Sequence, residues 1–339
     1  MRAMVLREFN KPLQQEEVPL PAIGNKDLLI KVQACGVCYT DVKIATGVFS
    51  YITLPRIMGH EIAGEVTSWG EGVKNFREGD RVCVYFYLNC GQCENCRGHK
   101  ENLCLNLRGR IGFHFDGGYA EYVKVPVTHA YKIPESVPIE EAAILADAVA
   151  TPLHALREQA KVKPGETVAI VGVGGLGIHA VQLARLLGSK VLAIDLDEKK
   201  LQAARELGAE AFSGAEEGLT DSILSTTGGK GVDVILDMVG ENETFQTSLS
   251  FLKAAGRYVI VGYSFEKPFS IFPHTILTKE FVLIGSRASR PRELADVLQW
   301  AADKKIKPMV SQSIPLNRAN QALERLQRYE IFHRVVLRP

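Results

Sequence analysis

The chain has 339 residues, of which 46% are hydrophobic and 23% charged, an ordinary composition for a globular protein of about two domains. Its 40 basic and 39 acidic residues give a formal charge of +1, which excludes the strongly basic surface of a general nucleic-acid binder. No apolar run reaches the ~18 residues of a membrane span, and the first residues lack the apolar stretch of a secretory signal. We therefore expect a cytoplasmic protein with neither a membrane nor a nucleic acid as partner.

The first 150 residues are predicted to be mainly β-structure. Short apolar runs bounded by Gly, Asp and Asn predict strands over 28–34, 62–68 and 81–87. Helical patterns follow over 140–158 and 176–187, and they alternate with further strands. These strands are predicted over 167–173, 190–196, 232–239, 256–263 and 281–286. Such alternation is typical of a doubly wound parallel sheet.

The last fifty residues do not continue this alternation. Helices are predicted over 293–303 and 317–328, and a strand over 334–339. We expect this segment to return to the first domain.

All seven cysteines lie between Cys35 and Cys104, which does not suggest a disulfide framework. Four of them follow the pattern C-x2-C-x2-C-x7-C: Cys90, Cys93, Cys96 and Cys104. Four thiolates close a tetrahedron around zinc and leave no open position, so the site would be structural. An iron–sulfur cluster is the alternative, since cysteines at this spacing also bind such clusters.

A glycine-rich segment follows the apolar strand residues TVAIV (167–171) and opens the helix IHAVQLARLLG (178–188). It reads Gly172-Val-Gly174-Gly175-Leu176-Gly177, and Asp195 ends the next predicted strand. In this strand–turn–helix context the pattern predicts a dinucleotide site with the pyrophosphate at the helix N-terminus. Asp195 accepts hydrogen bonds from ribose hydroxyls and repels a 2′-phosphate, so we predict NAD rather than NADP.

Cys38 and His60 stand in the segments ACGVCYTD and GHE. Taken alone, either residue is more often part of a core than a metal ligand. The spacing of Cys35 and Cys38 also occurs in redox-active pairs, although no βαβ pattern surrounds it here.

Several motifs, in order along the whole chain, together resemble those of the zinc-dependent alcohol dehydrogenases of the medium-chain dehydrogenase/reductase superfamily. They are GVCYTD (36–41), GHEIAGEV (59–66), GDRV (79–82), the four-cysteine lobe, DGGYAEY (116–122), GVGGLG (172–177) and Arg334 before VVL. The resemblance implies a GroES-like β-barrel catalytic domain over 1–150 and 287–339, with the structural zinc lobe at about 88–106. It implies a Rossmann NAD-binding domain over 151–286.

The resemblance also implies a catalytic zinc, and hence two zinc ions per chain. Cys38 and His60 become its ligands, and Asp147 takes the place where the family commonly has a second cysteine. Carboxylate oxygen is a normal zinc ligand, and some relatives are similar in using Asp. Glu61 is expected as an exchangeable fourth ligand, and Asp41 as the group that orients His60.

The reaction implied is reversible hydride transfer between NAD and an alcohol held as an alkoxide at zinc. Thr40 matches the family hydroxyl that takes the alcohol proton, and Lys43 replaces the histidine that many relatives use next. Lys200 and Arg334 match cofactor contacts, at the ribose and near the pyrophosphate. Tyr39 stands where many relatives carry Arg or His near the pyrophosphate, and its hydroxyl can still donate one hydrogen bond there.

The substrate is expected to be a small alcohol, aldehyde or ketone. Phe86 matches a pocket wall in the family, and Phe49, Tyr51 and Tyr263 are further candidate walls. The alternatives are a zinc-dependent polyol or sugar dehydrogenase of the same superfamily and a non-catalytic NADH-binding protein. Relatives of this length imply a homotetramer or a dimer, with a strand at about 281–286 pairing across a two-fold axis.

Overall fold

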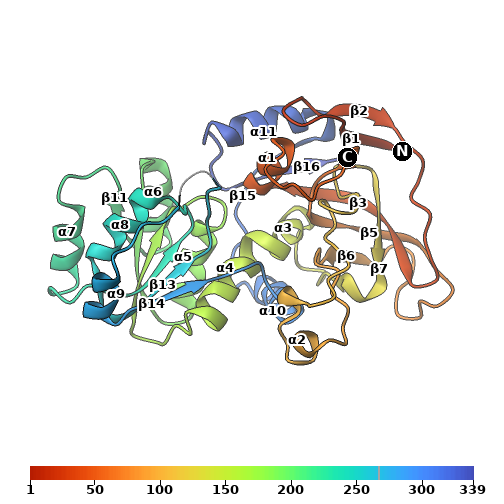
Figure 1. The fold of residues 1–339 in the computed structure, drawn as a ribbon. Coiled ribbons are helices and arrows are strands. Elements are labelled where there is room, and N and C mark those ends of the chain that lie inside the picture. Colours follow the sequence, from red (N-terminus) through yellow and green to blue (C-terminus); the bar gives the residue numbers. More distant parts are fainter. Residues whose placement is uncertain (266–267) are drawn as a thin grey trace. The chain divides into compact units, whose positions relative to one another are not determined.

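The computed structural model describes residues 1–265 and 268–339, and the chain divides into two units. Unit 1 contains Met1–Ala150 together with Ser289–Pro339, and unit 2 contains Thr151–Ala288. Each unit has its own sheets (Figure 1).

The main sheet of unit 1 is built around β3 (Asp27–Val37). Leu28, Ile30 and Val32 of this strand are buried and alternate with more exposed residues, which is the period of a strand with one face against a core. The strand order is β15-β16-β3-β5-β6-β8, and β7 also pairs with β3. The bounds of these strands are β5 (Glu61–Trp69), β6 (Arg81–Val84), β7 (Tyr122–Pro126), β8 (Ala130–Lys132), β15 (Val310–Pro315) and β16 (Arg334–Arg338).

The carboxyl-terminal segment belongs to this sheet. Strand β16 pairs antiparallel with β3, so that Val336 lies opposite Gly36, and β5 pairs with the other edge of β3, so that Glu61 also lies opposite Gly36. The start of β5, the end of β3 and the start of β16 therefore meet at one end of the sheet.

A smaller three-stranded sheet and several helices complete unit 1. The sheet has the order β2-β1-β4, with β1 (Arg2–Leu6), β2 (Gln14–Glu17) and β4 (Arg56–Ile57). The helices are α1 (Tyr39–Ala45), α2 (Glu94–Arg97), α10 (Pro291–Ala302) and α11 (Ala319–Gln327), with 3-10 turns η1 (Glu101–Leu103), η2 (Val127–His129) and η5 (Leu316–Arg318).

A helical segment extends from Ile139 to Gln159 and contains two wider turns. It consists of α3 (Ile139–Ile144), the π-helical turn η3 (Leu145–Val149), α4 (Ala150–His154) and a second π-helical turn η4 (Ala155–Gln159). Such turns insert an extra residue and are frequent at functional sites, because they change the direction in which side chains point.

Unit 2 is a six-stranded sheet in which every pairing is parallel. The order β11-β10-β9-β12-β13-β14 corresponds to 3-2-1-4-5-6 in the order of the chain, which is the Rossmann arrangement. The strands are β9 (Thr167–Val171), β10 (Lys190–Asp195), β11 (Glu210–Ser213), β12 (Val232–Asp237), β13 (Leu252–Ile260) and β14 (Val282–Gly285). The helices are α5 (Gly177–Leu186), α6 (Glu198–Glu206), α7 (Leu219–Thr226), α8 (Asn242–Ser250) and α9 (Pro273–Lys279). The predicted doubly wound parallel sheet is confirmed.

Several short strands were not among the sequence predictions. Strands β2 and β11 are rich in polar or half-exposed residues, and β15 reads VSQSIP with mostly exposed side chains. An apolar pattern cannot find such strands, because neighbouring strands rather than buried side chains hold them. In the part of the chain that the structure describes, no helix is long and apolar enough to cross a bilayer.

Candidate active site and metal centres

Four ligand-type side chains from three separate segments meet in unit 1. Cys38 precedes α1, His60 and Glu61 stand at the start of β5, and Asp147 lies in the π-helical turn η3. One ligand atom from each lies within 4.8 Å of the others, and all four side chains are buried. The structure thus brings together the predicted ligands of the catalytic zinc.

A hydrogen bond at the N-terminus of α1 fixes the position of Cys38. Asp41, at the third position of the helix, accepts a hydrogen bond of 2.8 Å from the backbone N–H of Cys38. This reciprocal cap satisfies a backbone donor that the helix itself leaves unpaired. The sulfur of Cys38 is thereby fixed at the end of β3.

Asp41 also faces His60, as the sequence predicts. Its Oδ1 lies 3.3 Å from His60 Nδ1, and its Oδ2 accepts a bond of 3.0 Å from the hydroxyl of Tyr119. The other ring nitrogen of His60, Nε2, then points to Asp147, with 3.7 Å between Nε2 and Oδ2. A carboxylate behind a ligand imidazole in this way sets the ring orientation and the tautomer.

The backbone before His60 makes a turn that needs glycine. Gly59 has φ +90°, and a Cβ there would lie 2.4 Å from the ring of Tyr119. The carbonyl of Gly59 accepts a bond of 2.8 Å from the N–H of Gly118, in the DGGYAEY segment. The two motifs therefore pack on each other, and Tyr119, which the sequence analysis did not single out, supports the site.

Glu61 is completely buried and forms an ion pair with Arg334 of β16. The guanidinium donates to the Glu61 carboxylate from Nη2 at 2.6 Å and from Nε at 3.1 Å, and Nη2 also lies 3.4 Å from Oδ2 of Asp147. A Cβ at Gly36 would lie 1.9 Å from Oε2 of Glu61, so only glycine leaves room for this carboxylate. The structure places Arg334 in the metal-ligand cluster; its predicted contact with a pyrophosphate stays a prediction.

The distances in the cluster fit a tetrahedral zinc ion. Ligand atoms ~2.0–2.3 Å from such an ion stand about 3.3–3.8 Å from one another. The sulfur of Cys38 lies 3.6 Å from Oδ2 of Asp147, and Nε2 of His60 lies 3.7 Å from the same oxygen. One nitrogen, one thiolate and one carboxylate form a donor set that leaves a fourth position for another oxygen.

The cluster also has the electrostatics of a cation site. Burial would lower the pKa of His60, but the carboxylates of Asp41 and Asp147 raise it well above its ordinary value. Burial raises the pKa of Glu61 to about 7, although Arg334 opposes this shift. The protons that these groups hold are those that a bound metal ion replaces.

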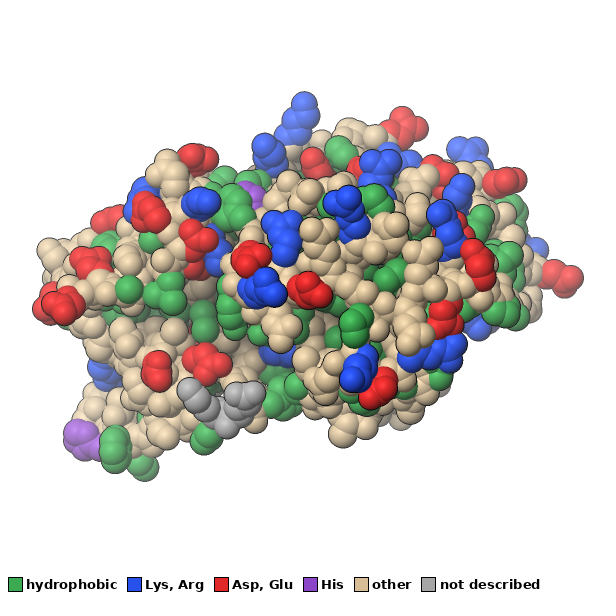
Figure 2. Space-filling view, turned by 90° about the horizontal axis from the view of Figure 1, so that it is seen from above, with side chains coloured by type: hydrophobic (Ala, Val, Ile, Leu, Met, Phe, Trp, Pro, Cys, Tyr) green, Lys and Arg blue, Asp and Glu red, His purple; other side chains and the backbone are tan. Residues whose placement is uncertain are grey.

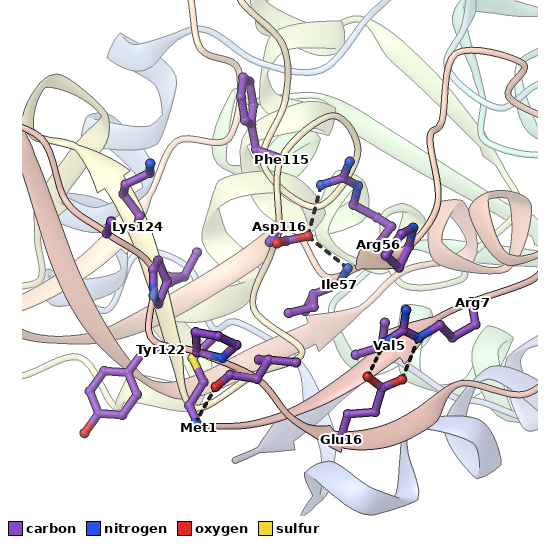
Figure 3. A pocket seen from close by; sticks show the side chains of 16 residues that line it. Met1, Val5, Arg7, Glu16, Arg56, Ile57, Phe115, Asp116, Tyr122 and Lys124 are labelled. Carbon is purple, nitrogen blue, oxygen red and sulfur yellow. Dashed lines mark hydrogen bonds and ion pairs between the residues drawn. The ribbon is translucent and has the colours of Figure 1, made fainter.

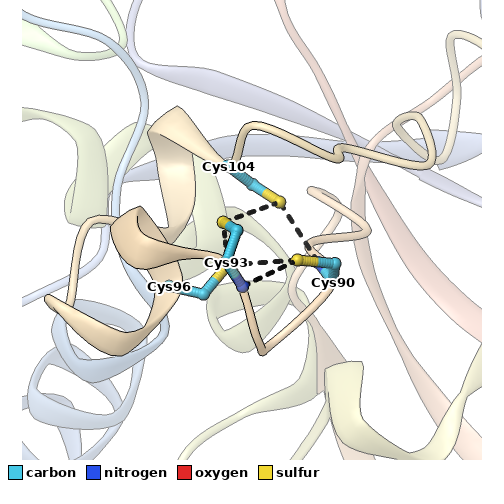
Figure 4. Close-up of side chains that lie close together, drawn as sticks. All are labelled: Cys90, Cys93, Cys96 and Cys104. Atoms are coloured by element: carbon cyan, nitrogen blue, oxygen red, sulfur yellow. Dashed lines mark hydrogen bonds between the residues drawn. The ribbon is translucent and has the colours of Figure 1, made fainter.

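The four cysteines of the lobe at 88–106 converge around one point (Figure 4). The sulfur of Cys93 lies 3.5 Å from that of Cys96 and 3.9 Å from that of Cys104, and Cys90 lies 3.9 Å from Cys96. Four sulfurs about 2.3 Å from one zinc ion stand ~3.8 Å apart, so the site fits a single zinc ion and is too small for an iron–sulfur cluster. A backbone N–H donated by Cys96 lowers the pKa of Cys93 to about 6, which favours its thiolate.

The remaining cysteines are buried thiols. Cys35 and Cys83 are completely buried, and burial raises the pKa of both. Both are free, so Cys35 and Cys38 are not a disulfide pair.

In unit 2, the glycine-rich turn has the geometry of a phosphate-binding loop. Gly172 has φ +87°, and a Cβ at Gly177 would lie 1.9 Å from the carbonyl oxygen of Gly172, so both turn and packing require glycine. A Cβ at Gly174, by contrast, would meet no atom within 4 Å. The space beside Gly174 is therefore open to a ligand, next to Gly175 and Leu176 at the N-terminus of α5.

Asp195 ends β10 beside this loop. Its Oδ2 accepts a bond of 2.7 Å from the N–H of Val173, and its Oδ1 lies 3.6 Å from Nζ of Lys200. The structure thus brings together the loop, the acidic residue and the lysine that the sequence assigned to the ribose.

Aromatic rings cover one side of His60. Phe86 lies 4.9 Å from the His60 ring and Phe113 lies 5.3 Å from it, and Phe49 packs on Phe113 at 6.2 Å. Phe113 was not predicted, since no pattern marks an aromatic residue that follows a glycine turn. Tyr51 lies further out and stacks on His114 at 5.0 Å.

Tyr263, the last candidate for the pocket wall, lies in unit 2. It lines a hollow of about 250 Å³ that also includes Gly240 and Gly262. This hollow follows β13, on the carboxyl-end side where Rossmann sheets bind their ligands.

The residues predicted to move the proton lie in α1. Thr40 is half-buried, and its hydroxyl makes no hydrogen bond within the described ranges 1–265 and 268–339. The Tyr39 ring stacks on Tyr329 at 5.7 Å, and Nζ of Lys43 lies 5.8 Å over the Tyr39 ring.

A larger cavity of about 430 Å³ in unit 1 contains none of the predicted ligands among its lining residues (Figure 3). Two ion pairs border it: Arg7 with Glu16 at 2.6 Å, and Arg56 with Asp116 at 3.0 Å. Both of its carboxylates are thus paired with arginines that also line it.

Comparison with known proteins agrees with this geometry. Family models described as "Alcohol dehydrogenase GroES-like domain" and "Zinc-binding dehydrogenase" match residues 24–135 and 175–303. An alcohol dehydrogenase of Geobacillus stearothermophilus is 36% identical, over 100% of this chain and 99% of its own. An NAD-dependent alcohol dehydrogenase of Sulfurisphaera tokodaii is 33% identical over 100% of both chains.

A solved structure extends the similarity to the fold. The alcohol dehydrogenase of Aeropyrum pernix superposes with a TM-score of 0.94 at 33% identity and covers 100% of both chains. The chain combines a GroES-like domain with a Rossmann sheet, as the sequence predicts. It belongs to the zinc-type alcohol dehydrogenase family of the medium-chain dehydrogenases/reductases.

Two substitutions in the glycine-rich loop separate folding from ligand binding. Gly177→Ala places a Cβ against the carbonyl of Gly172 and is expected to lower the free energy of unfolding by about 2 kcal/mol. Gly174→Ala meets no protein atom, so stability should hold while NADH affinity falls about tenfold. Urea unfolding and a fluorescence titration with NADH measure these effects. Unaltered NADH binding in Gly174→Ala would refute the role of the loop.

The contact between Gly36 and Glu61 makes a second prediction. Gly36→Ala displaces the carboxylate that pairs with Arg334, so it should lower the free energy of unfolding by about 3 kcal/mol. In a Glu61→Ala background, Gly36→Ala should lower the free energy of unfolding much less, because the carboxylate that it would displace is absent. If the two substitutions lower the free energy of unfolding additively in this double-mutant cycle, the contact between Gly36 and Glu61 is refuted.

Proposed function

We propose that this protein is an NAD-dependent, zinc-dependent alcohol dehydrogenase with one catalytic and one structural zinc ion per chain. The observation that carries the proposal is the convergence of Cys38, His60 and Asp147 at distances of 3.6 and 3.7 Å. Family membership and the glycine-rich turn of unit 2 support the same reaction.

Cys38, His60 and Asp147 would hold a zinc ion, which would supply acidification of an alcohol hydroxyl, and unit 2 would hold NAD, which would supply the hydride acceptor. The chain's own residues prepare and protect this step. Asp41 orients His60, Arg334 balances the charge of Glu61, and Phe86 and Phe113 exclude water beside His60. Glu61 acts as the exchangeable ligand, and Thr40 takes the proton from the alcohol. Lys43, one turn further along α1, passes it on.

Cofactor binding falls to unit 2. The N–H groups of Gly175, Leu176 and Gly177 bind the pyrophosphate, and Asp195 accepts hydrogen bonds from the adenosine ribose. Lys200 lies 3.6 Å from Asp195 and donates to the same ribose. Tyr39 and Arg334 contribute from unit 1.

An apolar alcohol, aldehyde or ketone suits the site better than a sugar. Phe49, Phe86 and Phe113 are 7%, 4% and 3% exposed and form an apolar wall beside His60. Such a wall offers no hydrogen bonds to the several hydroxyls of a polyol. Tyr51 and Tyr263 extend the substrate pocket.

The protein acts on small molecules as a cytoplasmic homotetramer or dimer. Its seven free cysteines suit a reducing compartment. Acidic and basic side chains are interspersed on the face seen in Figure 2, which does not favour nucleic acid. Subunits associate through β14, an edge strand whose Val282 and Leu283 are 51% and 42% exposed, beside Leu277 at 73%.

Zinc content and alcohol turnover test the proposal together. The unaltered protein should hold two zinc ions and reduce NAD with alcohols. Cys93→Ser should lose the structural ion, and Asp147→Ala the catalytic ion with all turnover. Asp147→Cys should keep both, because cysteine is also a zinc ligand. Cys83→Ser, outside both groups, is the control; turnover in Asp147→Ala would refute the assignment.

Cofactor preference tests Asp195. Asp195→Asn keeps an acceptor for the N–H of Val173 but removes the charge, and it leaves Lys200 available to a 2′-phosphate. The ratio of kcat/KM for NADP to that for NAD should rise by about tenfold or more. Steady-state kinetics with both cofactors measure this ratio. A ratio that does not move would show that Asp195 does not discriminate.

A further inference from the structure

We propose that Arg110 is a specificity-determining residue of this site, and that the substrate it selects carries a carboxylate. The preferred substrate is then a hydroxy acid, or the matching aldehyde or keto acid. This inference rests on the proposed alcohol dehydrogenase function and specifies its substrate class. It follows from the aromatic rings that hold the guanidinium of Arg110 and from the lack of a carboxylate paired with it in the described residues.

Three aromatic rings hold the guanidinium in place. Its central carbon lies 4.3 Å from the ring centroid of Phe113, 5.0 Å from that of Tyr51 and 5.6 Å from that of Tyr87. The Arg110 carbonyl accepts hydrogen bonds from the N–H groups of Phe113 and His114 at 3.2 and 2.9 Å, so the backbone is fixed as well. A cation packed on aromatic faces keeps its position but gains no counter-charge from them.

No acidic group balances this charge. In residues 1–265 and 268–339, no carboxylate forms an ion pair with Arg110, and its Nε is buried without a hydrogen-bond partner. The nearest acid downstream in the chain, Asp116, accepts bonds from Arg56 at 3.0 Å and from the N–H of Ile57 at 3.1 Å (Figure 3). An arginine fixed in position without an anion is an arrangement that suits an anionic ligand.

The guanidinium is two ring contacts away from a predicted zinc ligand. The Phe113 ring contacts the guanidinium of Arg110, and the same ring lies 5.3 Å from the ring of His60. A substrate whose oxygen sits beside His60 can therefore lay a short methylene chain along Phe113 and Phe86 and place its far end at Arg110. The apolar wall and the cation together select an apolar chain that ends in an anion.

Charge at the two ends fixes the orientation of such a substrate. The anionic groups of the cluster, Cys38, Asp41, Glu61 and Asp147, outnumber the positive charges of Arg334 and the proposed zinc ion, so the cluster has no surplus positive charge for a second carboxylate. Arg110 attracts it, and its planar guanidinium pairs with both carboxylate oxygens. The hydroxyl end is thereby directed to the metal ligands.

Kinetics with matched substrates test the proposal. A series of ω-hydroxy carboxylates of increasing length is compared with the corresponding carboxamides, which have the same shape but no charge. The unaltered enzyme should favour the acids by about tenfold in kcat/KM at the best length. Arg110→Met should abolish this preference by raising KM for the acids, with kcat and the amides unchanged. Arg108→Met removes the same charge from an exposed neighbour and should behave as the unaltered enzyme.

The outcomes separate the two proposals. Turnover of the amides without preference for acids, or a preference that survives Arg110→Met, overturns the role of Arg110 and leaves the dehydrogenase intact. Equal losses for acids and amides, with a lower Tm, show a structural role only and also overturn it. If no alcohol is oxidised, the dehydrogenase proposal fails, and calorimetry with a saturated fatty acid and its amide decides on Arg110. Binding of the acid that does not weaken in Arg110→Met would then refute it.

Discussion

Buried negative charge is the constraint on which unit 1 depends. Asp41, Glu61 and Asp147 are buried together around Cys38 and His60, and the guanidinium of Arg334 alone does not balance them. An uncompensated buried carboxylate costs several kcal/mol, so the arrangement is stable only with further positive charge. In the proposed function a divalent cation among these ligands supplies it, and without one a proton on His60, whose pKa the neighbouring carboxylates raise, does so. The same carboxylates whose burial destabilises the fold thereby define the chemistry of the site.

The strands were predicted best where their buried side chains leave an apolar run in the sequence. The strands of unit 2 are runs such as TVAIV and VDVILD, whose burial leaves a continuous apolar pattern, and the glycine motif locates the first turn. Polar strands such as Gln14–Glu17 were not predicted, because hydrogen bonds to neighbouring strands hold them and burial of their own side chains does not. The limits of the predicted elements differ from those of the structure mostly by a few residues.

The site was predictable from motifs only up to its ligands. Cys38, His60 and Asp147 stand in recognisable segments, but the pairing of Glu61 with Arg334 joins residues 273 positions apart. No local pattern contains that information, and the same holds for Tyr119 behind Asp41 and for Phe113 beside His60. These supporting residues depend on the register of β3, β5 and β16, which only the folded sheet reveals.

The place of β16 in the sheet has a consequence for synthesis of the protein. Arg334 follows Glu61 by 273 positions and comes after the whole of unit 2, so Glu61 lacks this counter-charge until unit 2 has been synthesised. The edge of β3 that β16 later covers is open for the same period, and an open strand edge invites pairing with other chains. In the described residues the strands of unit 2 pair only with one another, so unit 2 can fold meanwhile. The pairing of β16 with β3 thus forms only after unit 2 has been synthesised, and chains that still lack this pairing are the species most exposed to aggregation.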